Sequence, residues 1–327
     1  MKAIQLSSFG DPLAVVQVVD VDPPAAPGPG ELRVQVDCAP INPSELLMVR
    51  GLYGFRPPLP WGLGQEGVGQ VLAVGAGVDG LAVGDRVVLP PDAGAWREQL
   101  LVAASEVVRV PADVDPQQLS MARINPPTAA LLLSEFVDLQ PGEWVIQNAG
   151  NSGVGRSVIA FAAARGLKTV SLVRRPELIE PLLAAGADAV LLEGPGIAKR
   201  VAQATGGAPI RLGLDGVAGE STAALSSCLA QDGVLVAYSG MSGAPGQLNP
   251  LHVIFRNIEV RGFWLGHARW RHDPKVAAAV QQAAQLMAQG RLQVPVAAAY
   301  GLDQVRDALA HALRGGKVLF RAAAASS

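Results

Sequence analysis

Between residues 144 and 166 an apolar segment, a glycine-rich turn and a helical pattern follow one another without interruption. Trp144–Ala149 predicts a buried strand, and Gly153–Arg165 predicts a helix that ends at Gly166. Small residues in the turn let the backbone approach a ligand, and N–H groups around Ser152–Val154 can face a pyrophosphate at the positive end of the helix dipole. This order favours a dinucleotide site, although the same glycines also suit a tight turn without a ligand.

The alternation of apolar strands and helical patterns continues to about residue 260, which predicts a parallel sheet covered by helices. The strands and helices expected after the first pair are, in chain order, Lys168–Val173, Glu177–Ala185, Ala189–Leu192, Ile197–Thr205, Ile210–Leu214, Ser221–Leu229, Val234–Ser239 and Ile258–Phe263. We therefore expect an α/β fold in which residues 123–260 form a doubly wound, Rossmann-type dinucleotide-binding domain.

Residues 1–122 have a different pattern, in which short β-prone segments alternate with glycine, proline and aspartate. The segments are Leu32–Val36, Val68–Val74, Arg86–Leu89 and Glu106–Val110. This pattern predicts a β-rich domain, barrel-like or partly open. Residues 261–327 form a third range that returns to the β-rich domain, with helices expected at Pro274–Ala288 and Leu302–Leu313.

The composition excludes several classes of partner. A formal net charge of −2 and a pI near 6.1 give no electrostatic reason to expect a nucleic acid or an anionic membrane. No apolar run reaches the roughly 20 residues of a membrane span, and the segment MKAIQLSSFGDP has no apolar core of a secretory signal. The two cysteines, Cys38 and Cys228, belong to no paired motif, which suits a cytoplasmic location.

The end of the second expected strand bears on the choice of cofactor. A site for NAD(H) usually carries an acidic residue there, which accepts from the ribose 2′-OH. Here Arg174 and Arg175 follow Val173 and can bind a 2′-phosphate through charge-assisted hydrogen bonds. The pair favours NADPH, and the alternative is a solvated basic turn with Glu177 as its partner.

The glycine- and proline-rich segment 41–69 contains Tyr53, one of three tyrosines in the chain, and neither cysteine nor histidine. The four histidines, which lack the spacing of a metal site, are His252, His267, His272 and His311. We therefore expect no metal. A phenol beside a dinucleotide can assist hydride transfer as a hydrogen-bond donor or an acid, although a tyrosine in such a loop can also serve packing alone.

A β-rich domain, an inserted nucleotide domain and a returning tail resemble the layout of the medium-chain dehydrogenase/reductase superfamily. Its zinc-dependent members place a cysteine near the position of Asn42 and a histidine in the word G-H-E, where this chain has Gln65 and Glu66. Within the superfamily the chain is most similar to the mitochondrial-type 2-enoyl thioester reductases. The matching words, in order, are INPSELLMVRGLYG, GQEGVGQVLAVG, INPPTA, VIQNAGNSGVG, the turn Tyr238-Ser239-Gly240-Met241, RGFWL and GGKVLF.

The resemblance implies a GroES-like N-terminal catalytic domain and NADPH-dependent reduction of the trans-2 double bond of an enoyl-CoA or enoyl-acyl carrier protein by a homodimer. It implies that Tyr53 is catalytic and that Asn42, Tyr53 and Trp264 line the substrate pocket. The positions that match cofactor contacts of the family are Asn125, Asn151, Ser152, Gly153, Val154, Arg174, Arg175, Tyr238, Ser239, Gly240, Met241, Phe263, Trp264, Leu265 and Lys317.

Some positions depart from the family pattern. The stretch Gly62–Gly67 replaces Gly-Gly-Asn-Glu-Gly, and Pro176 stands where a second basic residue is common. These changes bear on acyl chain length and cofactor affinity and leave the reaction type unchanged. Trp264 can alternatively be a core tryptophan at a strand end. Two other functions stay open: a zinc-independent NADPH:quinone or small enone oxidoreductase, and a cofactor-binding protein without turnover.

Overall fold

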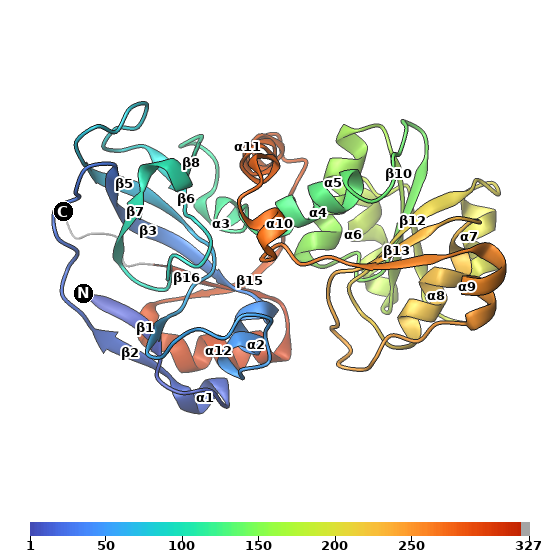
Figure 1. The fold of residues 1–327 in the computed structure, drawn as a ribbon, viewed down its shortest axis with the longest axis horizontal. Helices are drawn as coiled ribbons and strands as arrows, with labels where there is room; N and C mark the ends of the chain where they lie inside the picture. Colours follow the sequence, from blue (N-terminus) through green and yellow to red (C-terminus); the bar gives the residue numbers. More distant parts are fainter. Residues whose placement is uncertain (322–327) are drawn as a thin grey trace. The chain divides into compact units, whose positions relative to one another are not determined.

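The computed structural model describes residues 1–321, which form two compact units (Figure 1). The first unit contains Met1–Ile124, Val280–Ala288 and the chain from Val294 onward, and the second contains Asn125–Ala279 and Gln289–Gln293. Residues 322–327, the end of the expected third range, lie outside the described residues.

The second unit is built on six parallel strands in the order β11-β10-β9-β12-β13-β14. Their bounds are β9 Trp144–Gln147, β10 Lys168–Val173, β11 Ala189–Leu192, β12 Ile210–Asp215, β13 Val234–Ala237 and β14 Glu259–Gly262. The helices are α4 Asn125–Ser134, α5 Gly153–Ala164, α6 Ile179–Ala184, α7 Ile197–Ala204, α8 Glu220–Cys228, α9 Pro250–Arg256 and α10 Ala268–Arg271, with a 3-10 turn at Pro176–Leu178. Winding in both directions from β9 is the doubly wound α/β pattern, so the expected fold class is confirmed.

The interior strands of this sheet are largely buried on both faces, as a parallel sheet covered by helices requires. Val145, Ile146, Leu172, Leu212 and Leu235 are all fully buried. Continuous apolar runs of four to six residues between glycine turns therefore made these strands recognisable in the sequence.

The second unit extends beyond the range expected for it. Residues 261–279 belong to it, whereas the sequence predicts them in the returning tail. The physical reason is that β14 runs to Gly262 beside β13 and that Phe263 and Trp270 pack together, with ring centroids 5.7 Å apart. Helix α11, Pro274–Ala288, has the bounds that its periodicity predicts.

The first unit contains two sheets. One has the order β15-β16-β3-β5-β6-β8 with β7 also paired to β3, and the other has the order β2-β1-β4. The strands are β1 Lys2–Leu6, β2 Val16–Asp20, β3 Glu31–Ile41, β4 Trp61–Gly62, β5 Val68–Val74, β6 Arg86–Val88, β7 Gln99–Ala103, β8 Val108–Val110, β15 Val296–Tyr300 and β16 Lys317–Arg321. The helices are α1 Pro12–Val15, α2 Pro43–Val49, α3 Pro116–Leu119 and α12 Val305–Arg314, with 3-10 turns at Ala104–Glu106 and Leu302–Gln304.

The C-terminal strand lies inside the larger sheet of this unit. Strand β16 runs antiparallel to β3 and parallel to β15. Trp96 packs edge-on against Phe320 of β16 at 4.9 Å between ring centroids, and its indole N–H donates to the Pro40 carbonyl at 3.0 Å. Residues from both ends of the sequence therefore share one apolar core.

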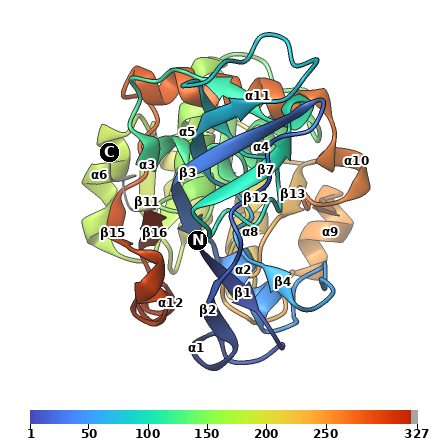
Figure 2. The same cartoon turned by 90° about the vertical axis from the view of Figure 1, so that its left-hand side faces the viewer.

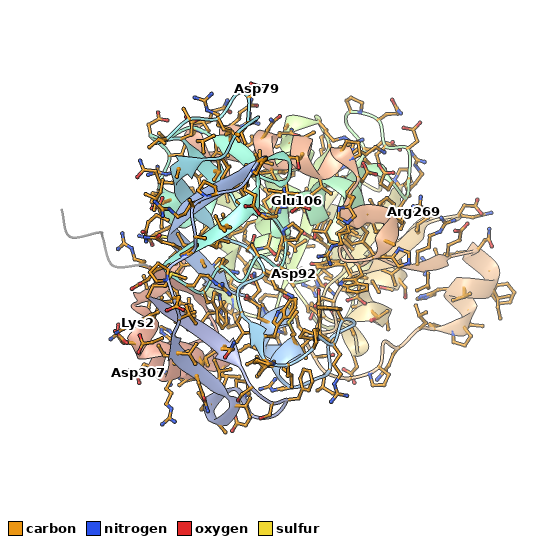
Figure 3. All side chains as sticks on the ribbon, turned by 60° about the vertical axis from the view of Figure 1, so that its left-hand side comes forward. Lys2, Asp79, Asp92, Glu106, Arg269 and Asp307 are labelled. Atoms are coloured by element: carbon orange, nitrogen blue, oxygen red, sulfur yellow. The ribbon has the colours of Figure 1, made fainter. Side chains whose placement is uncertain are left out.

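The smaller sheet is fixed to the C-terminal part of the chain as well. Strands β1 and β2 lie side by side (Figure 2), and Lys2 of β1, labelled in Figure 3, forms an ion pair with Asp303. Among the helices of residues 1–321, none is long and apolar enough to cross a membrane.

Candidate active site

The glycine-rich turn of the second unit joins β9 to α5. Ser152 is the N-cap of α5, and its hydroxyl accepts a hydrogen bond from the Gly155 N–H at 3.0 Å. Ala149 has a positive φ of 49°, which turns the chain sharply at the end of β9. The N–H groups of a first helical turn have no intrahelical partners, and with the helix dipole they suit an anionic group.

Glycine is required at three positions of this turn. A Cβ would lie 2.7 Å from Ser171 Cβ at Gly150, and 2.5 Å from Asn125 Nδ2 at Gly153. At Gly155 it would lie 2.5 Å from the Ala149 carbonyl oxygen. Since Cβ atoms essentially never approach other heavy atoms below 3.0 Å, an added Cβ would force its neighbour to move at each position, and at Gly155 that neighbour is backbone. This packing is required by the fold of the turn itself.

Most of the expected cofactor positions follow the carboxyl ends of neighbouring strands. Gln147 is in register with Ser171 and Leu214, and Ala237 is in register with Asp215 and Gly262. The segments that begin at this edge are Asn148–Ser152, Arg174–Arg175, Tyr238–Met241 and Phe263–Leu265. The order of the strands reverses direction at β9, and ligands of open α/β sheets bind at the carboxyl edge beside such a point.

Two buried polar atoms near the turn indicate a missing polar partner. The Asn125 Nδ2 atom is buried beside Gly153 without a hydrogen-bond partner. The Tyr238 hydroxyl is buried near Ser152 and Gly216 and makes no hydrogen bond of normal geometry. Burial raises the pKa of Tyr238 above its usual range, so the phenol remains protonated. Leaving such groups unpaired costs about 1–3 kcal/mol each, so these residues fit a polar ligand such as a dinucleotide.

The arginine pair lies at the exposed end of β10. Both side chains are exposed, and Arg175 Nε lies 3.5 Å from Glu177 Oε1. The contact with Glu177 is exposed and therefore weak, so a phosphate can replace it. The 2′-phosphate role expected for Arg174 and Arg175 stays a prediction.

Phe263 and Trp264, two of the expected residues that follow β14, have different surroundings. Phe263 is buried against Phe136 and Trp270, with ring centroids 6.2 and 5.7 Å away, so its side chain belongs to an aromatic cluster. Trp264 is about one-third exposed, and its indole lies where a Cβ on Gly266 would be 2.7 Å away. The side chain of Phe263 is thus placed for packing, and a ligand contact there would come from the backbone.

In the first unit Tyr53 lies in the loop between α2 and β4. Gly51 has a positive φ of 71° at the start of the loop. Further along, Phe55 packs edge-on against Trp61 at 5.9 Å, and the Arg56 guanidinium lies 4.3 Å from the ring centroid of Phe9. These contacts hold the loop that carries Tyr53, which is itself half-buried.

Asn42, at the start of α2, belongs to a buried polar network that joins three segments of the first unit. Its Nδ2 donates to Glu66 Oε1 at 2.8 Å, and its Oδ1 accepts from Lys317 Nζ at 2.7 Å. Glu45 accepts from the N–H groups of Asn42 and Gln65 at 2.7 and 2.8 Å. Since both ends of the Asn42 amide are engaged, its orientation is fixed.

The network contains two carboxylates and one ammonium group. Burial raises the pKa of Glu45 to about 8 and also raises the pKa of Glu66, which the nearby Lys317 partly counteracts. Burial lowers the pKa of Lys317, and the two carboxylates oppose that shift. The sequence did not predict this network, because nothing in the spacing of Glu45, Glu66 and Lys317 indicates that they meet.

The positions that carry ligands in zinc-dependent relatives have other partners here. Asn42 is bonded to Glu66 and Lys317, and Gln65 Oε1 accepts from the Ser44 hydroxyl at 2.5 Å. Within residues 1–321, no three His, Cys, Asp or Glu side chains are grouped so as to hold a metal ion.

The expected residues thus form two sets. Asn42, Tyr53 and Lys317 lie in the first unit, and the remaining expected positions lie in the second. The ammonium of Lys317 is bonded to Asn42, so its expected contact with the cofactor stays a prediction. The expected place of Trp264 beside Tyr53 also stays a prediction.

Comparison with known proteins identifies the family of both parts of the chain. Residues 28–112 match the model described as alcohol dehydrogenase GroES-like domain, and residues 153–289 match the model described as zinc-binding dehydrogenase. The solved complex of Etr1p with NADP and crotonyl-CoA has a TM-score of 0.87 over 98% of this chain and 99% of that chain, at 24% identity, which establishes the fold. A putative NADPH:quinone reductase from Bacillus thuringiensis has a TM-score of 0.86 at 28% identity, with 98% of both chains covered.

Curated relatives give the narrower assignment. The mitochondrial enoyl-[acyl-carrier-protein] reductase of Rattus norvegicus is 38% identical over 317 residues, which cover 94% of this chain and 84% of the relative. The human protein of the same name is 37% identical with the same coverage. The chain therefore belongs to the family of mitochondrial-type enoyl-[acyl-carrier-protein] reductases within the medium-chain dehydrogenase/reductase superfamily.

Proposed function

We propose that the chain is an NADPH-dependent oxidoreductase that reduces the trans-2 double bond of an enoyl thioester, carried on CoA or on acyl carrier protein. The observation that carries this proposal is the identity of 38% with an enoyl-[acyl-carrier-protein] reductase over nearly the whole chain. The unpaired Asn125 amide and Tyr238 hydroxyl beside a glycine-rich turn supply independent support for a polar cofactor at the sheet edge.

The residues at the carboxyl edge of the sheet would hold the cofactor. The N-terminus of α5 would hold the pyrophosphate, Arg174 and Arg175 would bind the 2′-phosphate, and Tyr238–Met241 would contact the nicotinamide half. When bound, NADPH supplies the hydride that is added to Cβ of the substrate. The protein's own task is to orient both molecules and to stabilise the negative charge that develops on the thioester oxygen.

Tyr53 performs the second part of that task. Its phenol donates a hydrogen bond to the thioester oxygen, where charge accumulates as Cβ is reduced. Cα then receives a proton, either from the phenol or from a water molecule that the phenol holds. The amide of Asn42, which is proposed to contact the acyl group, is held in one orientation by Glu66 and Lys317.

The proposal is tested by following NADPH absorbance with crotonyl-CoA and, in parallel, with a small quinone. We expect rapid oxidation with the thioester and little with the quinone, because the tyrosine loop is suited to a thioester oxygen. The reverse result would assign the chain to the quinone or small enone oxidoreductases. NADPH binding without oxidation by either acceptor would indicate a binding protein.

Replacing both Arg174 and Arg175 by serine is expected to raise the KM for NADPH by about 10- to 100-fold, since each guanidinium loses a charge-assisted contact with phosphate. The KM for NADH should change little, because NADH lacks the 2′-phosphate. Steady-state kinetics with both nucleotides measures the ratio. Lys168→Ser is the matched control, because Lys168 lies at the amino end of the same strand β10. An unchanged NADPH preference would leave a solvated basic turn as the role of the pair.

We also propose a homodimer formed through the second unit. Strand β14 ends the sheet order, and all four of its residues are exposed. Helix α9 and strand β14 expose the apolar side chains of Leu251, Ile254, Phe255 and Val260. The side chain of Phe255 is 75% exposed. An unpaired edge strand with exposed apolar side chains beside it favours pairing with a second copy about a two-fold axis.

Light scattering should give twice the chain mass of 33.8 kDa. Phe255→Glu places a charge on this face and is expected to shift the protein toward the monomer. Val83→Glu is the control, because Val83 is also an exposed apolar residue but lies in the first unit. A monomer in the unaltered protein would contradict the proposal.

The cytoplasmic location expected from the sequence is likewise retained as a proposal. Cys38 and Cys228 are free thiols, which suits a reducing compartment, whereas the names of the relatives place those proteins in mitochondria. Fractionation of cells that produce the tagged chain would separate the two locations.

A further inference from the structure

Glu66 joins two distant segments of the first unit. The residue is fully buried, and its Oε1 accepts from Asn42 Nδ2 at 2.8 Å. Its Oε2 accepts from two consecutive backbone N–H groups, those of Arg123 at 3.1 Å and Ile124 at 3.0 Å. These are the last residues of the first unit before the chain enters the second at Asn125.

The segment held by Glu66 leads directly into helix α4. The residues after Asn125 are Pro126 and Pro127, which have no N–H groups and have a fixed φ. The direction of the helix is therefore set at its first residues with little freedom for adjustment. A carboxylate that accepts from the two preceding N–H groups fixes where this stiff segment starts.

The first residue of α4 is the one that meets the glycine turn. The Asn125 amide nitrogen is buried without a hydrogen-bond partner, and a Cβ on Gly153 would lie 2.5 Å from it. The Asn125 side chain therefore occupies the space beside Gly153 that a larger residue would fill. A small displacement of the start of α4 would therefore move this amide away from a ligand bound at the turn.

The other carboxylate oxygen of Glu66 is held from the C-terminal strand. Lys317 is the first residue of β16, whose next residue Val318 is in register with Ile41. The ammonium of Lys317 donates to Asn42 Oδ1 at 2.7 Å, and the Asn42 amide donates to Glu66. If the Asn42 amide were rotated by 180°, its NH2 group would face the Lys317 ammonium, which is also a donor. The amide therefore stays in this orientation, and its hydrogen bond holds Glu66 in place.

We propose that Glu66 is a positioning residue for the cofactor site: through the Arg123–Ile124 backbone it sets the place of Asn125 beside the glycine turn. Asn42 and Lys317 hold the second oxygen of the carboxylate. This inference rests on the proposed function in that it takes NADPH as the ligand of the turn. Glu66 acts on NADPH binding through Asn125 and does not itself contact the cofactor.

The test measures the Kd for NADPH by fluorescence titration in the wild type, Glu66→Gln, Asn125→Ala and the double variant. A glutamine can offer only one acceptor oxygen, so it satisfies either Asn42 or the two backbone N–H groups. Glu66→Gln is expected to raise the Kd about 10-fold in the wild-type background. In the Asn125→Ala background the same change should have an effect below about 2-fold, because the residue through which it acts is gone. Equal effects in both backgrounds would overturn the proposal.

Glu45→Gln is the matched control. Glu45 is also fully buried and also accepts from two backbone N–H groups, but these belong to Asn42 and Gln65. Both glutamine variants are expected to lower the Tm, and only Glu66→Gln should weaken NADPH binding. Equal weakening by Glu45→Gln would show that general destabilisation is the cause, and the proposal would fall.

Glu66→Asp serves as the second variant if Glu66→Gln does not fold. It keeps the negative charge but is one methylene shorter, so it cannot reach both sets of donors, and the same comparison in two backgrounds applies. The titration uses NADPH without an enoyl substrate. A wild type that binds NADPH but does not reduce crotonyl-CoA would refute the proposed function and leave this test intact.

Discussion

Tyr53→Phe is expected to lower kcat for crotonyl-CoA reduction by about 100-fold, because the variant cannot donate a hydrogen bond to the thioester oxygen or supply a proton toward Cα. The KM should change little, since the ring and its packing are retained. The rate of NADPH oxidation at saturating crotonyl-CoA measures kcat directly.

Tyr300→Phe is the appropriate control for that experiment. Tyr300 is another of the chain's three tyrosines, and its hydroxyl lies 3.0 Å from His311 Nδ1. Removal of this hydroxyl should leave kcat unchanged. Full crotonyl-CoA turnover by Tyr53→Phe would remove Tyr53 from the mechanism and leave it as a packing residue of its loop.

Gly155→Ala is expected to weaken NADPH binding by about 100-fold or more, because the third glycine of such a turn allows the close packing of helix and strand. The added Cβ would lie 2.5 Å from the Ala149 carbonyl oxygen and 2.6 Å from that of Gly150. Both neighbours are backbone atoms, so the turn itself must open and displace the N-terminus of α5. Fluorescence titration measures the Kd, and far-UV circular dichroism checks that the variant is folded.

Gly301→Ala is the control for Gly155→Ala. Gly301 has a φ of −71°, and a Cβ there would have its nearest contact at 3.8 Å. This substitution should leave NADPH binding unchanged. Wild-type affinity in Gly155→Ala would mean that the turn is not the pyrophosphate site.

The elements that the sequence predicted best are those whose pattern depends on local burial. Val68–Val74, Lys168–Val173, Ala189–Leu192 and Pro274–Ala288 have the predicted bounds. In each case a mainly apolar segment or a helical stripe has a glycine, an aspartate or a proline at or near at least one of its ends. The expected helix at Glu177–Ala185 is a 3-10 turn followed by α6, because Pro176 and Pro181 limit regular hydrogen bonding.

Other elements have no such local pattern in the sequence. Helix α4 begins Asn-Pro-Pro-Thr, a sequence that reads as a turn until its buried surroundings are known. Strands β15 and β16 are short and pair with each other, and β16 also pairs with β3, more than 250 residues earlier in the chain. Long-range pairing of this kind is decided by tertiary contacts that no local window contains.

The candidate site was predictable to a similar extent. The turn around Ser152 is visible because a strand, glycines and a helix follow one another, and Tyr53 is visible because its loop matches a family motif. The network of Asn42, Glu66 and Lys317 was not visible, since it depends on three separate segments meeting inside the first unit. Sequence motifs thus indicated candidate ligand-binding residues, whereas the contacts that hold such residues in place had to come from the structure.

The position of β16 has a consequence for the order in which the chain can fold during synthesis. Most of the second unit is continuous in sequence, from Asn125 to Ala279, so its sheet can form while the ribosome is still adding residues. The larger sheet of the first unit lacks an interior strand, between β15 and β3, until Lys317–Arg321 has been made. The first unit, whose N-terminal part is translated first, is therefore completed last. Until then the edge of β3 that pairs with β16 is open to pairing with other chains.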